Sequence, residues 1–368
     1  MFKKKLQMLF KQSIQKIFFF IHGKVRHDKI TIQNLVYKKN ITAIKSDVFP
    51  NKIYSVYYIK NARIYTDTNE NVAIIKDNNI IPDISFQQAS GFIKDAKFNS
   101  VISKGTPRFK KIFKGRIFSL VQGASGNNFF HFMFDIIPKL TLLKQVEKIQ
   151  DIDYFYAPKI QKWQIIIYEY LGLNVSKLID SDKFRHIKGD EIITVDHPWY
   201  FKNNIQNEVA NIPDWIINNN RKLFSSYSTK FDNNNRIFLD RSSSVYSHCQ
   251  INNNNEFKDI LEARGFTSYK VEDLTFEQQI YLFTEASIII GAHGAAFTNI
   301  VYCKPNTKII EIIPVSHPNK KCERICGVLN LIHHKIITED TSNDKSFPYN
   351  ITLKKEHFDK INKAIDLY

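Results

Sequence analysis

Cysteine, glycine and long apolar runs are all scarce in this sequence. Its 368 residues include four cysteines and 12 glycines. Four thiols at irregular spacing are too few for a disulfide framework, and Cys322 and Cys326 lack the second pair that a zinc site needs. No stretch approaches the roughly 20 apolar residues of a transmembrane helix. We therefore expect reduced, structural thiols in a cytoplasmic protein.

Several motifs of nucleotide and nucleic-acid chemistry are also missing. No Gly-x-Gly-x-x-Gly follows the first expected strand of either half, which counts against a dinucleotide-binding dehydrogenase. The Asp-x-Asp pairs at 151–153 and 180–182 are isolated rather than placed at strand ends, so a metal-bridged diphosphate is not supported. No helix-turn-helix, zinc-finger or RNA-recognition pattern is present, and we expect no nucleic-acid partner and no metal.

The composition is that of a basic globular protein. Hydrophobic residues make up 43% and aromatic residues 13% of the chain, which is long enough for two domains. The 52 Lys and Arg against 36 Asp and Glu give a formal net charge of +16. This surplus favours anionic partners, such as anionic lipid or a phosphorylated or acidic sugar.

The segment 1–27 combines lysines with apolar residues at helical spacing. Leu6, Leu9, Phe10 and Ile17 are among the residues that fall on one helical face, and an aromatic cluster closes the segment. A basic amphipathic helix of this kind can lie in the interface of an anionic membrane. A helix packed on the body with a solvated lysine face explains the pattern equally well. A signal peptide is disfavoured, because polar residues interrupt the apolar region and no small-residue cleavage site follows.

The rest of the chain alternates strand-like and helix-like segments, which predicts the α/β class. We expect an N-terminal α/β domain over 28–228 and a second domain over 229–345, with the polar run 225–235 as the linker. Residues 346–368 are expected to form a helix that packs back on the N-terminal domain.

A polar stripe runs along an expected helix after a glycine-rich loop. Asn127 or Asn128, His131 and Asp135 recur every three or four residues on an otherwise apolar surface. Such groups are costly to bury without partners, so they indicate either a site wall or an Asn helix cap beside an internally bonded histidine. In the first case His131 serves as a general base that Asp135 orients, with the reverse assignment left open. His197 and His248 are weaker candidates, and we expect His197 to be a loop histidine without a role.

Anion-binding features gather at expected strand ends in the second half. Asp240 and Arg241 follow one short buried strand, and Arg241 can bind phosphate oxygens bidentately. After another strand, the loop 291–294 opens into an expected helix, whose N-terminal amides can hold a phosphate. His293 could donate to a phosphate or sugar oxygen, or fix the loop through backbone hydrogen bonds. Glu311 could accept from ribose hydroxyls, or only pair with a lysine.

A series of short motifs keeps a fixed order along residues 123–314. The order is Asn-x-x-His-x-x-x-Asp-x-x-Pro, Asp-Arg, Ile-Asn with a nearby Glu, Gly-Phe, Leu-x-x-Glu-Gln, Gly-x-His-Gly-Ala-x-x-Thr-Asn and Glu-Ile-Ile-Pro. The residues concerned are Asn128, His131, Asp135, Pro138, Asp240, Arg241, Ile251, Asn252, Glu256, Gly265, Phe266, Leu274, Glu277, Gln278, Gly291 to Asn299, and Glu311 to Pro314. In this order the sequence resembles glycosyltransferase family 61.

The resemblance implies a GT-B fold, in which two Rossmann-like domains face a central cleft. It also implies inverting transfer from a nucleotide sugar without a required metal. Two departures concern the donor side: Tyr246, Ser247 and His248 stand where the family commonly has further arginines, and Gly294-Ala295-Ala296 stands in place of Gly-Ala-Gly.

On this basis we expect a bacterial hexosyl- or pentosyltransferase that needs no cofactor beyond a UDP-, CMP- or GDP-linked sugar donor. The expected acceptor is a cell-surface polysaccharide or lipid-linked glycan, such as capsule or lipopolysaccharide, at the inner face of the cell membrane. The expected donor-binding residues are Asp240, Arg241, Gly291, His293, Gly294, Ala295, Asn299 and Glu311, and Asn127 and Asn128 are expected on the acceptor side. A non-catalytic sugar- or nucleotide-binding protein with the same fold is the alternative.

Overall fold

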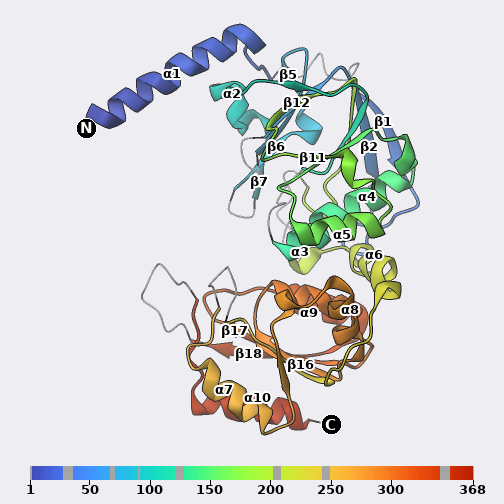
Figure 1. The fold of residues 1–368 in the computed structure, drawn as a ribbon, viewed down its shortest axis with the longest axis vertical. Coiled ribbons are helices and arrows are strands. Elements are labelled where there is room, and N and C mark those ends of the chain that lie inside the picture. The colour runs from blue at the N-terminus through green and yellow to red at the C-terminus, as the bar shows by residue number, and fades with distance from the viewer. Residues whose placement is uncertain are drawn as a thin grey trace. The chain divides into compact units, whose positions relative to one another are not determined.

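A computed structural model describes residues 2–27, 36–66, 71–89, 92–121, 128–201, 209–242, 249–339 and 349–367. The chain divides into two compact units, Met1–Glu208 and Val209–Tyr368 (Figure 1). The division falls earlier than the expected residue 229. The reason is that helix α6 (Asp214–Phe224) packs against η9 (Ala295–Tyr302) and α9 (Lys321–Leu329) of the second unit.

The first unit contains two sheets. The first sheet has the strand order β1-β2-β13-β9-β10-β11. Strands β13, β9, β10 and β11 run parallel, and β2 pairs antiparallel with both β13 and β1. Its strands are β1 (Tyr37–Ile41), β2 (Tyr54–Lys60), β9 (Arg116–Ser119), β10 (Tyr154–Ala157), β11 (Leu178–Asp180) and β13 (Glu191–Val195). Ile59, Ile117 and Ile192 are fully buried, as expected for strands covered on both faces.

The second sheet of this unit has the order β7-β6-β4-β3-β12-β8, and β5 also pairs with β4. Its strands are β3 (Arg63–Thr66), β4 (Asn71–Lys76), β5 (Asn79–Ile80), β6 (Phe86–Ala89), β7 (Phe92–Lys94), β8 (Lys111–Ile112) and β12 (His186–Lys188). The helices of the unit are α1 (Phe2–His22), α2 (Ser100–Lys104), α3 (Phe129–His131), a π-helical turn η3 (Phe132–Ile136), α4 (Ile137–Lys144) and α5 (Lys162–Tyr170). Short 3-10 turns are η1 (Pro82–Ile84), η2 (Ala96–Phe98), η4 (Ile149–Asp151) and η5 (Val175–Lys177).

Helix α1 contacts the first unit through one side of its C-terminal half. Gln15 Nε2 donates to the carbonyl of Ser103 at 2.5 Å, and the ring of Phe18 lies 5.1 Å from that of Phe109. Gly105, at φ +67°, gives Phe19 room, because a Cβ there would lie 2.5 Å from the Phe19 ring. In Figure 1 the N-terminal part of α1 runs outward from this anchor. Among the described residues, no helix combines the length and apolarity that crossing a membrane requires.

The second unit is built on five parallel strands in the order β15-β14-β16-β17-β18. The strands are β14 (Arg236–Leu239), β15 (Thr267–Tyr269), β16 (Ile288–Ala292), β17 (Lys308–Pro314) and β18 (Ile332–Thr338). Besides α6, α9 and η9, its helices are α7 (Asn254–Glu262), α8 (Phe276–Glu285), α10 (Lys355–Asp366), η6 (Val209–Asn211), η7 (Ser225–Tyr227) and η8 (Val271–Asp273). Helices α8 and α9 lie on one face of the sheet and α7 and α10 on the other (Figure 1).

This strand order sets the place where a ligand is expected. Numbered along the chain, the strands stand in the order 2-1-3-4-5. The connection after β14 runs to β15 at one edge of the sheet, and the connection after β16 runs to β17 in the opposite direction. In open α/β sheets the crevice at such a switch point, outside the carboxyl ends of the strands, is where ligands bind. Here that point lies between the ends of β14 and β16.

Helix α10 packs on the second unit, which corrects the expectation that the C-terminal helix returns to the N-terminal domain. Ile361 and Ile365 join the core that Phe257 and Ile310 form. Lys308 Nζ donates to the carbonyls of Ile365 at 2.9 Å and Leu367 at 2.7 Å. The expected α/β class is confirmed, whereas the facing of two domains across a cleft stays a prediction.

Candidate active site

His131 and Asp135 form a hydrogen-bonded dyad in the first unit. Asn128 begins α3 as its N-cap, and its side chain accepts from the amide of Phe130 at 2.9 Å. The chain then passes through the π-helical turn η3, and His131 Nδ1 lies 2.9 Å from Asp135 Oδ2. Asn128 therefore acts as the cap that the sequence offered as one alternative. Asn127 lies outside the described residues.

Asp135 is fully buried, and the polar side chains near it are those of His131, Lys139 and Trp199. Trp199 Nε1 donates to Asp135 Oδ1 at 2.8 Å, and the buried Lys139 follows one turn later on the same stripe. Burial raises the pKa of the Asp135 carboxyl, and His131, Lys139 and Trp199 oppose that rise. Burial also lowers the pKa of Lys139 to about 7, and its ammonium donates to the carbonyl of Leu120 at 2.8 Å.

The dyad can move a proton at His131. A carboxylate only accepts hydrogen bonds, so Nδ1 of His131 carries the hydrogen that Asp135 receives. The other ring nitrogen, Nε2, then has a free electron pair, and 29% of the His131 side chain is exposed. This is the arrangement of a general base with an orienting carboxylate.

At the switch point of the second unit, Arg241 lies directly on Gly294. A Cβ atom on residue 294 would overlap the guanidinium of Arg241, so glycine is required for this approach. Gly291 serves the packing of the strands, since a Cβ there would lie 2.9 Å from that of Leu239. The two glycines of the 291–294 loop thus have separate roles, and the second one admits a cation.

Behind the loop, Glu311 holds two histidines. Nδ1 of His293 lies 2.5 Å from Oε1 of Glu311, and Nε2 of His333 lies 3.1 Å from Oε2. Burial opposes ionisation of Glu311, but these two donors hold its pKa below the ordinary value. Burial lowers the pKa of His293 to about 4, so this ring is neutral near pH 7 and donates from Nδ1. Glu311 is therefore an orienting carboxylate rather than the lysine partner of the alternative interpretation.

A second buried cation faces the same loop. Lys321, at the start of α9, donates to the carbonyl of Gly294 at 2.7 Å, and burial lowers its pKa. With Arg241 on the other side of Gly294, the loop carries two cationic side chains. Such a loop attracts phosphate oxygens.

The sulfur of Cys322 makes a possible metal triad with His293 and Glu311, because the three ligand atoms lie within 4.8 Å of one another. Burial raises the pKa of the Cys322 thiol well above its ordinary value, which disfavours the thiolate that a metal needs. Both oxygens of Glu311 already accept hydrogen bonds. The cluster is satisfied as a hydrogen-bond network, and the absence of a metal stays a prediction.

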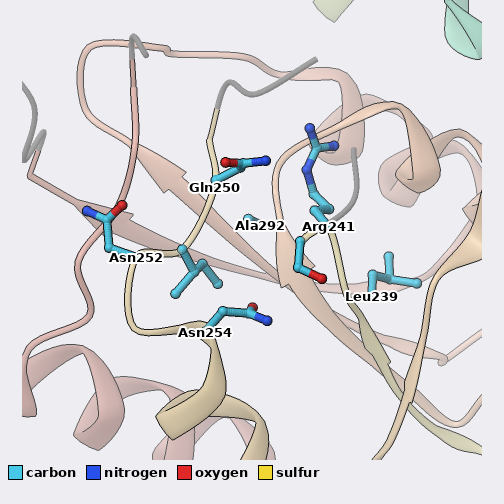
Figure 2. Close-up of a pocket in the computed structure, with 8 residues that line it drawn as sticks. Leu239, Arg241, Gln250, Asn252, Asn254 and Ala292 are labelled. Carbon is cyan, nitrogen blue, oxygen red and sulfur yellow. The ribbon is translucent and has the colours of Figure 1, made fainter. Parts of the chain in front are cut away.

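A cavity of about 260 Å³ lies beside Arg241 at the ends of β14 and β16. Figure 2 shows Arg241 and Leu239 on one side of it and Asn252 and Asn254 on the other, with Ala292 between them. Asp240 shapes this cavity rather than lining it. Its Oδ1 accepts from the amide of Ser242 at 2.9 Å and from Asn254 Nδ2 at 3.2 Å, which ties the end of β14 to the start of α7.

The remaining donor-side candidates lie in the helix after the loop. Ala295 begins η9, which is a 3-10 helix rather than the α-helix expected. The amide of His293 already donates to the carbonyl of Ile312 at 2.8 Å and is unavailable to a ligand. Asn299 is buried and donates to Gln279 Oε1 at 3.1 Å, so it links η9 to α8.

Four site residues escaped the sequence interpretation. Lys139 continues the His131–Asp135 stripe by another four residues, and extending the stripe would have found it. Trp199, Lys321 and His333 gave no comparable signal, because only the fold of each unit brings Trp199 to the dyad and Lys321 and His333 to the loop 291–294 and Glu311. His248 lies outside the described residues, and His197 proves to be buried beside Trp199.

Fold and site together define an α/β protein with a cationic loop at the switch point of a parallel sheet and a histidine–aspartate dyad. Residues 129–310, just under half of the chain, match the family model described as Glycosyltransferase 61.

Two curated plant proteins are similar over short stretches. The β-1,2-xylosyltransferase of Arabidopsis thaliana is 41% identical over 61 residues, which are 17% of this chain and 11% of that protein. The β-1,2-xylosyltransferase RCN11 of Oryza sativa subsp. japonica is 45% identical over 63 residues, 17% of this chain and 12% of that protein. The matched part thus spans about a tenth of the length of these relatives.

Proposed function

We propose that the protein is an inverting glycosyltransferase that moves a sugar from a nucleotide-sugar donor to a glycan acceptor. The observation that carries the proposal is the pair of cations at the Gly294 loop. Arg241 lies on this glycine and Lys321 bonds its carbonyl, next to a cavity at the switch point of the sheet. A nucleoside diphosphate fits such a place, since it brings two phosphates and a base for the neighbouring cavity.

In the proposed reaction, Nε2 of His131 takes the proton of the attacking acceptor hydroxyl. The oxygen forms a bond to the anomeric carbon as the bond between that carbon and the phosphate oxygen breaks. The bonding electrons leave with the nucleoside diphosphate, and Arg241 and Lys321 stabilise the charge that develops there. A single displacement inverts the anomeric carbon, and no metal takes part in this scheme.

For the donor we propose a UDP-, CMP- or GDP-linked sugar; a UDP- or GDP-linked sugar leaves a nucleoside diphosphate, whereas a CMP-linked sugar leaves CMP, a monophosphate, in its place. The names of the two plant relatives mention xylose, so nucleotide-linked xylose belongs among the first donors to test. For the acceptor we propose a bacterial cell-surface polysaccharide or lipid-linked glycan of the capsule or lipopolysaccharide type. The formal net charge of +16 suits a long or lipid-linked acidic acceptor.

We also propose that α1 holds the enzyme at the inner face of an anionic membrane. Its large exposed apolar residues are Leu6, Leu9, Phe10, Ile17, Phe20 and Ile21. At 100° per residue they fall within about a third of the helix circumference, opposite the side that carries Gln15 and Phe19. Residues 1–27 contain seven Lys and Arg and no Asp or Glu. An apolar stripe turned away from the body, on a segment whose Lys and Arg are balanced by no Asp or Glu, suits an anionic lipid surface.

Vesicle flotation tests the membrane proposal. The full chain is expected to float with vesicles that contain phosphatidylglycerol and not with pure phosphatidylcholine. The double variant Phe10→Ser/Phe20→Ser is expected to lose flotation, whereas Phe98→Ser, which changes an exposed phenylalanine elsewhere, retains it. Equal flotation of all three proteins would overturn the proposal. So would a wild-type protein that is dimeric and a double variant that is monomeric, since the apolar stripe would then be a dimer interface.

A nucleotide panel tests the donor proposal without knowledge of the acceptor. A ligand that binds only the folded state raises the melting temperature. We expect one nucleoside diphosphate to raise it in the wild-type protein and to have a much smaller effect on Arg241→Gln. Stabilisation without release of nucleoside diphosphate from any sugar donor would favour the alternative, a non-catalytic nucleotide-binding protein.

A further inference from the structure

We propose that Trp199 is a positioning residue, whose indole N–H fixes the Asp135 carboxylate so that His131 keeps its free electron pair on Nε2. The expected effect on the rate of sugar transfer rests on the proposed function. The expected effect on the tautomer of His131 depends only on the contacts of the dyad. It assigns a role to a side chain far from the helix in sequence.

The helix backbone beside Asp135 offers the indole N–H a second acceptor. Pro138 has no N–H, so the carbonyl of Phe134, four residues earlier, loses its ordinary α-helical donor. Trp199 Nε1 lies 3.2 Å from this carbonyl and 2.8 Å from Asp135 Oδ1. One N–H therefore lies within hydrogen-bond distance of both the Phe134 carbonyl and the carboxylate next to it.

The carboxylate is held at both oxygens. Trp199 contacts Oδ1 and His131 contacts Oδ2, so the plane of the Asp135 carboxyl is fixed between the two rings. Without the indole, a fully buried oxygen would lose its hydrogen bond, and the carboxyl could rotate or take up a proton. Either change would disturb the tautomer of His131.

The segment that carries Trp199 is itself anchored. His197 Nδ1 accepts from the amides of Trp199 at 3.3 Å and Tyr200 at 2.9 Å, and Tyr54 Oη donates to the carbonyl of Pro198 at 2.8 Å. Burial, with Lys139 and His131 nearby, keeps the pKa of His197 well below its ordinary value. A neutral His197 retains the acceptor that the turn requires. This histidine, expected to have no role, supports the indole.

Trp199→Phe is the direct test, because it removes the N–H and keeps most of the ring. Trp163→Phe is the matched control, since Trp163 packs on Phe129 and Phe132 of the same helix region. We expect Trp199→Phe to lower kcat by about 10- to 100-fold, the size of one hydrogen bond to a charged group, with the donor KM nearly unchanged. Trp163→Phe is expected to keep the wild-type kcat.

The pH profile separates positioning from loss of structure. The indole stabilises the ionised carboxylate, so its removal lets the dyad bind a proton more readily. The acidic limb of the kcat/KM profile is therefore expected to move to higher pH in Trp199→Phe, and to stay in place in Trp163→Phe. His197→Asn, which keeps an acceptor, is expected to retain more activity than His197→Ala.

Nitrogen NMR of the histidine side chains gives a readout that needs no activity. In the wild-type protein, His131 is expected as the tautomer with hydrogen on Nδ1, and in Trp199→Phe as a mixture. An unchanged tautomer together with an unchanged pH profile would overturn the proposal. A wild-type protein that transfers no sugar would defeat the proposed function, while the NMR result would still decide the role of Trp199.

Discussion

The guanidinium of Arg241 occupies the space that a Cβ atom on residue 294 would fill. Glycine is therefore needed at 294 for room rather than for backbone conformation, because its φ of 174° is ordinary extended geometry. The Arg241 side chain comes from the end of β14 and Gly294 follows β16, so the contact bridges the two strands at the switch point.

Gly294→Ala is expected to displace Arg241 while leaving the fold intact. The flexible end of the arginine can move away, so the cost should fall on ligand binding rather than on stability. We expect nucleoside diphosphate affinity to drop about 10- to 100-fold, as for loss of a charge-assisted hydrogen bond. Titration calorimetry measures this. Gly327→Ala is the control, since a Cβ at 327 meets nothing within 4 Å. Equal affinities in the two variants would show that Arg241 does not contact the ligand.

Lys321→Met is expected to weaken the binding of phosphates selectively. Its ammonium bonds the carbonyl of Gly294, and its positive charge lies beside the loop rather than the cavity. Affinity for a nucleoside diphosphate should fall several-fold more than affinity for the corresponding nucleoside. A parallel loss for both ligands would instead indicate that Lys321 only supports the local fold.

Removal of the dyad is expected to stop transfer without affecting the donor site. General base catalysis contributes about 10²- to 10⁴-fold, so His131→Ala should lower kcat by an amount in that range. Asp135→Asn should have a comparable effect, because an amide can force the wrong tautomer on His131. The change in melting temperature on adding nucleotide should match that of the wild type. If transfer persists in both variants, the base lies elsewhere.

Acid is expected to weaken the first unit through His186. Burial, followed by the charges of Arg63 and its neighbours, lowers the pKa of His186 to about 3. In the fold its Nδ1 bonds the carbonyl of Arg108 at 2.9 Å, and its Nε2 accepts from Arg63 at 3.0 Å. Because the unfolded chain binds a proton at higher pH than the fold does, this contribution to stability is lost as pH falls from about 6.5 toward 3.

Urea unfolding followed by tryptophan fluorescence checks this prediction. The free energy of unfolding of the wild type should fall by at most about 1.4 kcal/mol per pH unit from this group alone. His186→Gln lacks the titration, so its deficit relative to the wild type should shrink between pH 7 and pH 4.5. A constant deficit across this range would contradict the assignment.

The second unit could be predicted closely from the sequence because its signals are local. The short buried strand predicted before Asp240 is present as β14 (Arg236–Leu239), and Thr275 caps α8 with Gln278 in a reciprocal capping box. Short apolar runs between glycine or proline leave few alternatives for a buried parallel strand. Arg241, His293 and Glu311 then gather because the carboxyl ends of parallel strands share one edge.

What escaped prediction depends on tertiary contacts. The contact between His131 and Asp135, expected from their i, i+4 spacing, forms although Phe132–Ile136 is a π-helical turn. The contact of Trp199 with Asp135 had no local signal in the sequence. The polar run 225–235 suggested a linker, yet α6 before it packs with the second unit, since its apolar face contacts η9 and α9. A polar composition indicates a loop, but the unit to which a neighbouring helix belongs depends on where the apolar face of that helix is buried.

Release of nucleoside diphosphate from a panel of nucleotide sugars, with nucleotide-linked xylose included, tests the central claim most directly. The account predicts release or transfer with at least one donor by the full-length protein. It also predicts that this activity is strongly reduced in Arg241→Gln and in His131→Ala, with folding retained. No release from any donor by a folded protein, and no nucleotide that raises its melting temperature, would contradict the claim that this chain is a glycosyltransferase.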